Sequence, residues 1–261
     1  MRLMNKKSLK VNGIVVGETT YGDSSKILKV FTRDLGIISL MSKGCKKPKS
    51  NLHESSNKLV YATFNISYNE SGISTLISAD PINLFKNIIM DYHDIDKKMY
   101  SFYIIDLIIQ VINHMKIDND HDDNIYDMLI SSITKIDEGI NPRVLYDIVR
   151  LKMLDYLGVK PSLDGCNNCG SKDVITYSSD SYGYICKSCY SNEKIYSEES
   201  IKMLRMLYIV DLDRIKTMDV KDSVIEEIED FLDDYYIENT GIYLKSNKNK
   251  EILNKIKGVI D

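Results

Sequence analysis

The stretch Val60-Tyr61-Ala62-Thr63-Phe64-Asn65-Ile66-Ser67-Tyr68 gives the clearest structural signal in this chain of 261 residues. Its apolar side chains recur at every second position, and Asn65 and Ser67 stand between them. Successive side chains of a β-strand point to opposite faces of a sheet. The pattern therefore predicts a strand with one buried face and one solvated face.

Four further short apolar runs accompany this strand, and they cover residues 13–16, 26–32, 36–41 and 73–78. Turn residues such as Gly and Asp separate them. Parallel neighbours need a long crossover connection, and none of the intervening segments has a helical pattern long enough to supply one. We therefore predict a five-stranded antiparallel barrel of the OB type, an oligonucleotide- and oligosaccharide-binding fold, over residues 1–80.

After Asp80-Pro81 the apolar period changes to that of a helix. One stripe of an amphipathic helix comprises Ile104, Leu107, Ile108, Val111, Ile112 and Met115. Asn141-Pro142 predicts the start of a central helix that ends near Gly158. Two more helices are expected over residues 201–209 and 224–235, the second opened by a capping box of Ser223 and Glu226. The chain is thus predicted to be an α+β multidomain protein with a mostly helical body over residues 81–261.

Four of the five cysteines form two C-x2-C pairs that are separated by 16 residues; they are Cys166, Cys169, Cys186 and Cys189. This spacing is typical of a zinc knuckle, in which two tight turns bring four thiolates to one tetrahedral ion. Four protein ligands leave no position for a reacting water molecule. We therefore predict one structural Zn²⁺ ion in a knuckle over residues 164–191, inserted in the helical body.

Two other interpretations of the cysteines are less consistent with the sequence. Buried or disulfide-bonded cysteines rarely need a doubled C-x2-C, and the two close pairs suit a metal site in a reducing cytoplasm better than a disulfide framework. A zinc deaminase needs an H-x-E motif and a proline before its cysteine pair, but Gly165 occupies that position here.

Charge is distributed unevenly along the chain, whose formal net charge is −4. Residues 1–80 contain 12 Lys and Arg against 6 Asp and Glu, whereas residues 81–261 contain 22 against 32. Such asymmetry indicates a basic binding module joined to an acidic body. No segment approaches the roughly 18 consecutive apolar residues that would cross a bilayer, so we expect no membrane partner.

A basic segment follows the predicted strand at residues 36–41, and its cations are Lys43, Lys46, Lys47 and Lys49. Lysines on the rim of an OB barrel neutralise phosphates, and aromatic side chains of such barrels stack on bases. The candidates for stacking are Tyr21, Phe31, Tyr61 and Phe64. The alternative is that the lysines are merely solvated and the aromatic residues belong to the core.

The sequence also resembles the RecO family. The amino-terminal resemblance rests on Gly13-Ile14-Val15-Val16, Tyr21-Gly22-Asp23-Ser24-Ser25-Lys26-Ile27-Leu28, Phe31-Thr32-Arg33-Asp34-Leu35-Gly36 and Lys43-Gly44-Cys45-Lys46-Lys47-Pro48-Lys49-Ser50. Downstream, residues 143–158 followed by Pro161, Leu163, Cys166 and Cys169-Gly170 resemble the central helix and cysteine knuckle of that family. The segment 50–54 departs from it, since a further positive residue is expected there.

This resemblance implies an OB barrel that contacts DNA, a helical domain and a knuckle that supports the scaffold. It adds Lys26 and Arg33 to the four lysines as candidate DNA-binding residues. RecO-like proteins bind single- and double-stranded DNA, anneal complementary strands, contact the carboxy-terminal tail of single-strand-binding protein and act with RecR to load RecA. The resemblance therefore implies a cytoplasmic protein associated with the nucleoid. An apolar groove with a basic rim would suit the acidic tail, and Lys152 and Arg205 are possible members of that rim.

No catalytic residues are predicted. The four histidines are scattered, and a phosphate-binding G-x-x-x-x-G-K-[ST] loop is missing from the sequence. We therefore expect a protein that works by binding and is not an enzyme. Two rival hypotheses remain. One is a zinc-ribbon module that binds proteins and has no DNA role; it would not shift an oligonucleotide at low salt. The other is a hydrolase, whose turnover would be abolished by a single polar substitution.

Overall fold

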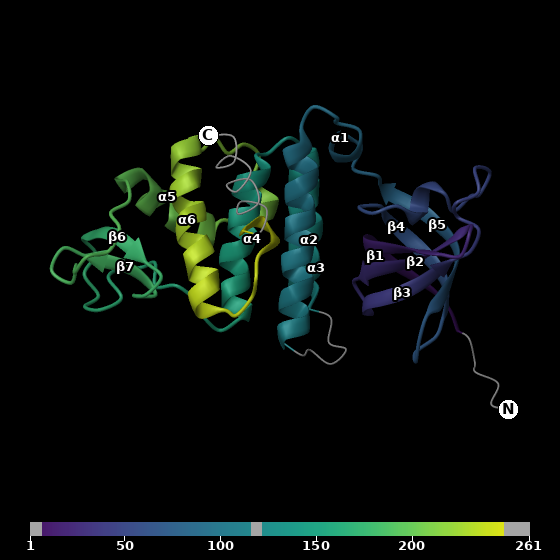
Figure 1. The fold of residues 1–261 in the computed structure, drawn as a ribbon, viewed down its shortest axis with the longest axis horizontal. Coiled ribbons are helices and arrows are strands. Elements are labelled where there is room, and N and C mark those ends of the chain that lie inside the picture. Colours follow the sequence, from purple (N-terminus) through teal and green to yellow (C-terminus); the bar gives the residue numbers. More distant parts are fainter. Residues whose placement is uncertain (1–6, 116–121, 248–261) are drawn as a thin grey trace, which may run out of the picture. The chain divides into compact units, whose positions relative to one another are not determined.

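The structure is a computed structural model that describes residues 7–115 and 122–247. It divides into two compact units, one made of residues 7–92 with 122–130 and the other of residues 93–115 with 131–247. The first unit contains a β-barrel, and the second contains a helical body with a small hairpin (Figure 1). None of the helices among the described residues is both long and apolar enough to cross a membrane.

Five strands form the closed barrel in the order β1-β2-β3-β5-β4, and they confirm the five strands predicted from the sequence. Their bounds are β1 Lys7–Tyr21, β2 Ser25–Thr32, β3 Gly36–Ser42, β4 Tyr61–Tyr68 and β5 Ser74–Asn83. The 3-10 turn η1, Glu54–Ser56, lies between β3 and β4 in the chain.

The barrel is not wholly antiparallel, which corrects one part of the prediction. The strands β3 and β5 pair in parallel through Leu40 with Ser74 and Met41 with Thr75. The other four pairings are antiparallel. The parallel contact is possible because β4 and the segment before it lie between β3 and β5 in the chain, so no tight hairpin has to join them.

The barrel interior is filled by alternate apolar side chains, as the period of two predicts. The fully buried members include Val15, Leu28, Val30, Leu40, Ala62, Phe64 and Ile66. Gly13 allows β1 to approach β2 closely, since a Cβ atom there would lie 2.7 Å from Val30 Cγ1. The pairing of β1 with β2 shifts between Val15 and Gly17, and this bulge lets the long β1 bend around the barrel.

Two strands extend beyond the apolar runs that predicted them. The strand β1 has 15 residues, and β5 continues through Asp80-Pro81 to Asn83. Pro81 pairs with Ala62 of β4. Proline is tolerated in a strand where its missing N–H faces away from the ladder. The short helix α1, Lys86–Ile89, follows.

The second unit is built mainly from helices, and the principal ones are α2 Ile95–Met115, α4 Pro142–Tyr156, α5 Glu198–Ile209 and α6 Asp222–Asn239. The helix α3, Asp123–Asp137, begins in the first unit and ends in the second, and the turn η2 covers Leu212–Arg214. The predicted stripe on α2 is buried at Ile104, Leu107, Ile108 and Val111.

The helix α4 is central, and both of its predicted ends are confirmed. The Asn141 side chain accepts a hydrogen bond from Arg143 N at 2.9 Å, and Pro142 occupies the first helical position. Gly158 has a positive φ of 73° just beyond the helix. Ten of the eleven residues from Val144 to Leu154 are buried, and Lys152 is the exception. This burial agrees with the central position predicted for the helix.

The predicted capping box at the start of α6 is wrong. The N-cap position is Lys221, no side chain caps the helix there, and Ser223 lies inside the first turn. Lys221 has an extended conformation and its Nζ pairs with Glu199 at 2.8 Å. The helix therefore begins two residues earlier than the motif indicates, so the hydroxyl of Ser223 cannot take the N-cap role.

Candidate nucleic-acid interface and metal centre

The four lysines of the basic segment lie together on an exposed loop between β3 and η1. Lys43, Lys46, Lys47 and Lys49 are all exposed, whereas Cys45 between them is buried. We call residues 43–49 the lysine loop. Four cationic side chains that project into solvent from seven residues form a strong local positive charge, which can neutralise a phosphate backbone.

The backbone of the lysine loop is fixed to the turn that joins β1 and β2. Lys46 N donates to Ser24 O at 2.9 Å, and Gly44 N donates to Ser25 Oγ at 3.1 Å. Gly44 has a φ of 67°, a conformation that glycine adopts without strain. The loop is therefore ordered by the barrel and does not rely on its lysines for its shape.

Of the four candidate stacking residues, Tyr21 is the one that is exposed, with 56% of its surface accessible. It is the last residue of β1 and pairs with Ser25, so it lies at the same turn to which the lysine loop is fixed. Phe31 and Phe64 are buried and serve the core, and Tyr61 is half-buried. The ring of Phe31 packs edge-on against Tyr126, with centroids 5.5 Å apart.

Lys26 lies beneath this region and is not a free cation. Its Nζ donates to Glu18 Oε2 at 3.1 Å, Asn57 Oδ1 at 3.0 Å and Ser56 O at 3.2 Å. Only 17% of the side chain is accessible. An ammonium group has three donors, and each of them has an acceptor here.

Arg33 lies at the other end of β2, about 23 Å along the strand from Lys26 at 3.3 Å per residue. Its guanidinium contacts the carboxylates of Asp127 and Asp123 from the start of α3 and lies over the ring of Tyr126. The structure therefore brings four of the six predicted cations together, places Lys26 under them and separates Arg33 from them.

The four predicted ligand cysteines form a compact cluster in the second unit. Their sulfur atoms all lie within 4.8 Å of one another, and Cys169 Sγ is 3.5 Å from Cys186 Sγ. Four sulfurs at about 2.3 Å from a tetrahedral zinc ion would be about 3.8 Å apart. The donor set and the spacing therefore fit a zinc ion, and the cluster can bind a metal.

The turns and strands around the cysteines explain how the cluster is held. Each pair closes a tight turn, since Gly170 N donates to Cys166 O at 2.8 Å and Cys189 N donates to Cys186 O at 3.1 Å. The hairpin of β6, Val174–Ser178, and β7, Gly183–Cys186, joins the pairs. Burial opposes ionisation of Cys166, but backbone N–H groups around its sulfur outweigh this effect and lower its pKa to about 6.

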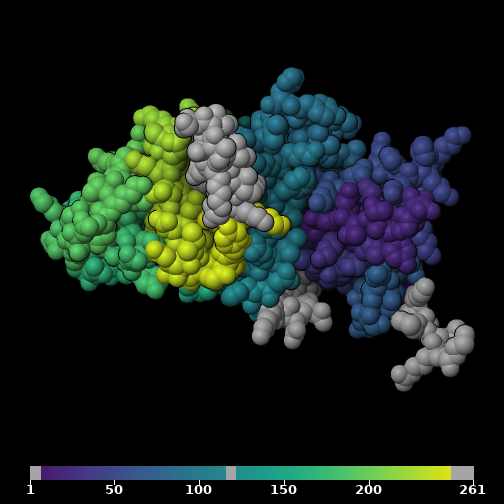
Figure 2. Space-filling model, in the orientation of Figure 1, coloured from purple at the N-terminus to yellow at the C-terminus, as the bar shows by residue number. Residues whose placement is uncertain are grey.

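Gly183 is required where β7 meets the segment that precedes the cluster. It has a φ of 139°, and a Cβ atom there would overlap Ser162 O. The knuckle lies beside α6 in this unit (Figures 1 and 2).

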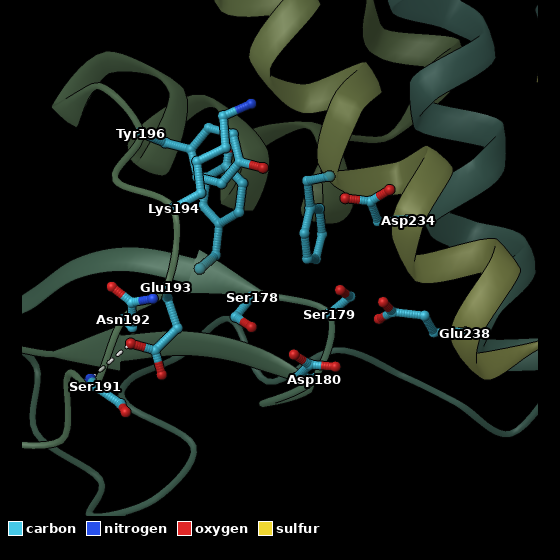
Figure 3. A pocket seen from close by; sticks show the side chains of 12 residues that line it. Ser178, Ser179, Asp180, Ser191, Asn192, Glu193, Lys194, Tyr196, Asp234 and Glu238 are labelled. Atoms are coloured by element: carbon cyan, nitrogen blue, oxygen red, sulfur yellow. Dashed lines mark hydrogen bonds between the residues drawn. The ribbon is translucent and has the colours of Figure 1, made fainter.

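A cavity of about 450 Å³ lies between the knuckle hairpin and α6, and Figure 3 shows its lining. Asp180, Glu193, Asp234 and Glu238 surround it, and the rings of Tyr177 and Tyr196 stack with centroids 4.2 Å apart. Burial and the neighbouring carboxylates of Asp230 and Glu238 raise the pKa of Asp234. The excess of carboxylates makes this cavity unsuited to phosphate.

A second hollow of about 410 Å³ lies between the knuckle and α5 and has a more apolar lining. We call it the α5 groove; its apolar members include Leu163, Val174, Ile201, Met206 and Ile209, and its cations are Lys172, Lys202 and Arg205. Arg205 lines this groove and pairs with Asp164, another lining residue, at 3.0 Å. Lys152 does not line the groove, and its Nζ donates to Tyr208 O at 3.3 Å.

Comparison with known proteins covers both units. The family model described as recombination protein O, amino terminal, matches residues 4–85, and the model described as recombination protein O, carboxy terminal, matches residues 92–248. Proteins named DNA repair protein RecO are similar over most of the chain. The one from Bacillus pumilus is 33% identical and covers 92% of each chain, and the one from Listeria welshimeri is 32% identical with the same coverage. The one from Bacillus cereus strain AH187 is 35% identical over 94% of this chain and 98% of its own.

These matches span the barrel, the helical body and the cysteine cluster, and they agree with the resemblance seen in the sequence. The chain therefore belongs to the RecO family of DNA repair and recombination proteins.

Proposed function

We propose that this protein is a recombination mediator that binds single- and double-stranded DNA and anneals complementary strands without catalysing a reaction. The observation that carries the proposal is the juxtaposition of four exposed lysines and the exposed ring of Tyr21 at one end of the barrel. Lysines reduce the repulsion between two phosphate backbones, and an aromatic ring stacks on bases of any sequence. The proposed DNA-binding module is residues 1–80 together with the end of β5 to Asn83, and the body comprises the rest of residues 81–261.

The partners of the mediator are RecR and single-strand-binding protein, and through them RecA is loaded on DNA in the cytoplasm. The α5 groove is our candidate for the tail of single-strand-binding protein. Its apolar lining suits apolar side chains of a peptide, and Lys172, Lys202 and Arg205 suit acidic ones. The sequence could indicate only Arg205, because the lining comes from segments that are distant in the chain.

One Zn²⁺ ion bound by the four cysteines has a structural role in this proposal. Thiolate ligands favour zinc, and a closed shell of four sulfurs leaves no position for substrate. When bound, the ion ties the two turns of the knuckle together. The chain's own hydrogen bonds at Cys166 and Cys186 orient these turns for the ion.

Strand annealing measures the proposed function directly. We expect the unaltered protein, with its zinc content assayed, to accelerate pairing of complementary oligonucleotides, and we expect Lys46→Gln/Lys47→Gln/Lys49→Gln to lose most of this acceleration. A matched control is Lys98→Gln/Lys187→Gln/Lys216→Gln, which removes three exposed lysines from the other unit. If the unaltered protein neither anneals nor shifts an oligonucleotide at low salt, the zinc-ribbon interaction module becomes the better hypothesis.

A further inference from the structure

Lys26 joins three segments of the barrel unit that are distant in the chain. Its own strand is β2, Glu18 belongs to β1, and Ser56 and Asn57 belong to η1 and the residue after it. Its charge is paired with Glu18, and its three donors are all used. A phosphate that contacted Lys26 would have to displace at least one of these acceptors.

The segment that Lys26 holds is the support of the lysine loop. Ser42 Oγ and Ser56 Oγ, both buried, are 2.8 Å apart, so η1 packs against the end of β3 where the loop begins. Asn57 Nδ2 in turn donates to His53 O at 3.3 Å and Glu54 O at 3.2 Å. His53 Nδ1 lies 3.0 Å from Cys45 O, inside the loop itself. A continuous series of contacts thus connects Lys26 to the lysine loop.

We propose that Lys26 is a positioning residue that holds the lysine loop in its DNA-binding shape through Asn57 and Ser56, and that it does not itself contact phosphate. This inference rests on the proposed DNA-binding function of the lysine loop. It separates Lys26 from Lys43, Lys46, Lys47 and Lys49, with which its charge alone would group it.

The two roles differ in how DNA binding depends on salt. A lysine that neutralises a phosphate releases a counterion, and its removal lowers the slope of log affinity against log salt by about 0.7 for a single strand. A residue that only orders the loop reduces the entropic cost of immobilising the loop when DNA binds. Its removal weakens binding by the same factor at every salt concentration and leaves the slope unchanged.

The test compares three variants of the full chain, Lys26→Met, Asn57→Ala and Lys46→Gln, by titration of a labelled single-stranded oligonucleotide over a range of salt. We expect Lys26→Met and Asn57→Ala each to weaken binding about fivefold with an unchanged slope. We expect Lys46→Gln to lower the slope by about 0.7. Asn57→Ala removes an acceptor of Lys26 and changes no charge, so it isolates the positioning effect and covers the case in which Lys26→Met folds poorly.

Amide hydrogen exchange of residues 43–57 gives a second readout that does not need DNA. The inference predicts faster exchange there in Lys26→Met and Asn57→Ala but not in Lys46→Gln. A slope lowered by about 0.7 in Lys26→Met, with normal exchange, would make Lys26 a phosphate contact and overturn the inference. Unchanged affinity in Asn57→Ala despite faster exchange would overturn it too. If the unaltered protein binds no oligonucleotide, the proposed DNA-binding function is wrong. Hydrogen exchange is measured without DNA, so it could not reveal that failure by itself.

Discussion

At the scale of single residues, Tyr21 is the side chain on which we expect base stacking to depend. It is exposed at the end of β1 beside the lysine loop. Stacking of one base on an aromatic ring contributes about 1 to 3 kcal/mol. We therefore expect Tyr21→Leu to weaken single-strand binding about tenfold, and binding of duplex, whose bases are already stacked, much less. Fluorescence anisotropy with both kinds of oligonucleotide measures this difference.

Two variants make the Tyr21 result specific. Tyr21→Phe keeps the ring and should bind normally, and Tyr182→Leu removes a ring of similar exposure from the other unit. Equal losses for single strands and duplex in Tyr21→Leu would contradict a stacking role.

Asp147 of α4 is a buried carboxylate in an unusual environment. Its Oδ1 accepts a hydrogen bond from Arg150, which also pairs with Asp233, and its Oδ2 has no hydrogen-bond partner among the described residues. Burial raises the pKa of Asp147 to about 7; Arg150 opposes the rise, whereas Glu229 and Asp233 add to it. The folded protein therefore binds a proton that the unfolded chain releases near pH 4.

The sign of the resulting pH dependence follows from linkage. Because the folded pKa lies above the unfolded one, the Asp147 contribution to stability is complete below about pH 4 and is lost as the pH rises through 7. Through this group, the free energy of unfolding changes by at most about 1.4 kcal/mol per pH unit. We expect Asp147→Asn to gain stability relative to the unaltered protein between pH 5 and 7. Urea unfolding at pH 5, 6, 7 and 8 measures the difference, and a difference that stays constant would refute the prediction.

The sequence predicted some residue roles and not others for a physical reason. The exposed lysines could be recognised because the charge pattern and Pro48 are local features. The partners of Lys26 lie 8 to 31 residues away, and the Asp127 partner of Arg33 lies 94 residues away. Pairings over such separations are set by the fold, so charge alone could not distinguish a free lysine from a paired one.

At the scale of elements, the two helix starts provide a paired test. The Asn141 side chain caps α4, whereas Ser223 caps nothing at the start of α6. Loss of an N-cap costs about 1 kcal/mol. We expect Asn141→Ala to lower the free energy of unfolding of the helical body by about that amount, and Ser223→Ala by less than about 0.5 kcal/mol. Denaturant unfolding followed by circular dichroism measures both, and a larger loss for Ser223→Ala would contradict the observed helix start.

The knuckle is the element whose stability we expect to depend on a metal ion. We expect Cys169→Ser/Cys189→Ser to lose the zinc ion, of which the unaltered protein should hold about one per chain. Residues 162–190 should then exchange their amide hydrogens faster, while oligonucleotide binding by the barrel unit stays normal. Metal analysis and hydrogen exchange measure these effects. Retention of zinc by the double variant would mean that other ligands hold it.

The strands of the barrel and the barrel itself were predictable, but the parallel direction of one strand pairing was not. Alternation in residues 60–68 and the short apolar runs located all five strands, because each pattern is local. The parallel pairing of β3 with β5 involves only two residue pairs and has no local signature. The helix α3 was not predicted, although its Tyr126 and Asp127 contact the barrel residues Phe31 and Arg33.

At the scale of the whole molecule, the net charge of −4 conceals an excess of cations in residues 1–80 and an excess of carboxylates in residues 81–261. Four cations of the amino-terminal barrel lie together on one exposed loop, while carboxylates line a cavity of the helical body. Screening confines electrostatic attraction to about 8 to 10 Å at physiological salt. We therefore expect DNA to respond to the local charge of the lysine loop and not to the average charge of the chain.

The salt dependence of single-strand binding tests this account most directly. If Lys43, Lys46, Lys47 and Lys49 each neutralise one phosphate, the slope of log affinity against log salt should be about three, at about 0.7 for each lysine. We predict that Lys46→Gln/Lys47→Gln/Lys49→Gln lowers the slope to about 0.7, and that Lys98→Gln/Lys187→Gln/Lys216→Gln leaves it near three. An unchanged slope in the first variant would contradict the account, since the phosphates would then be bound elsewhere on the protein.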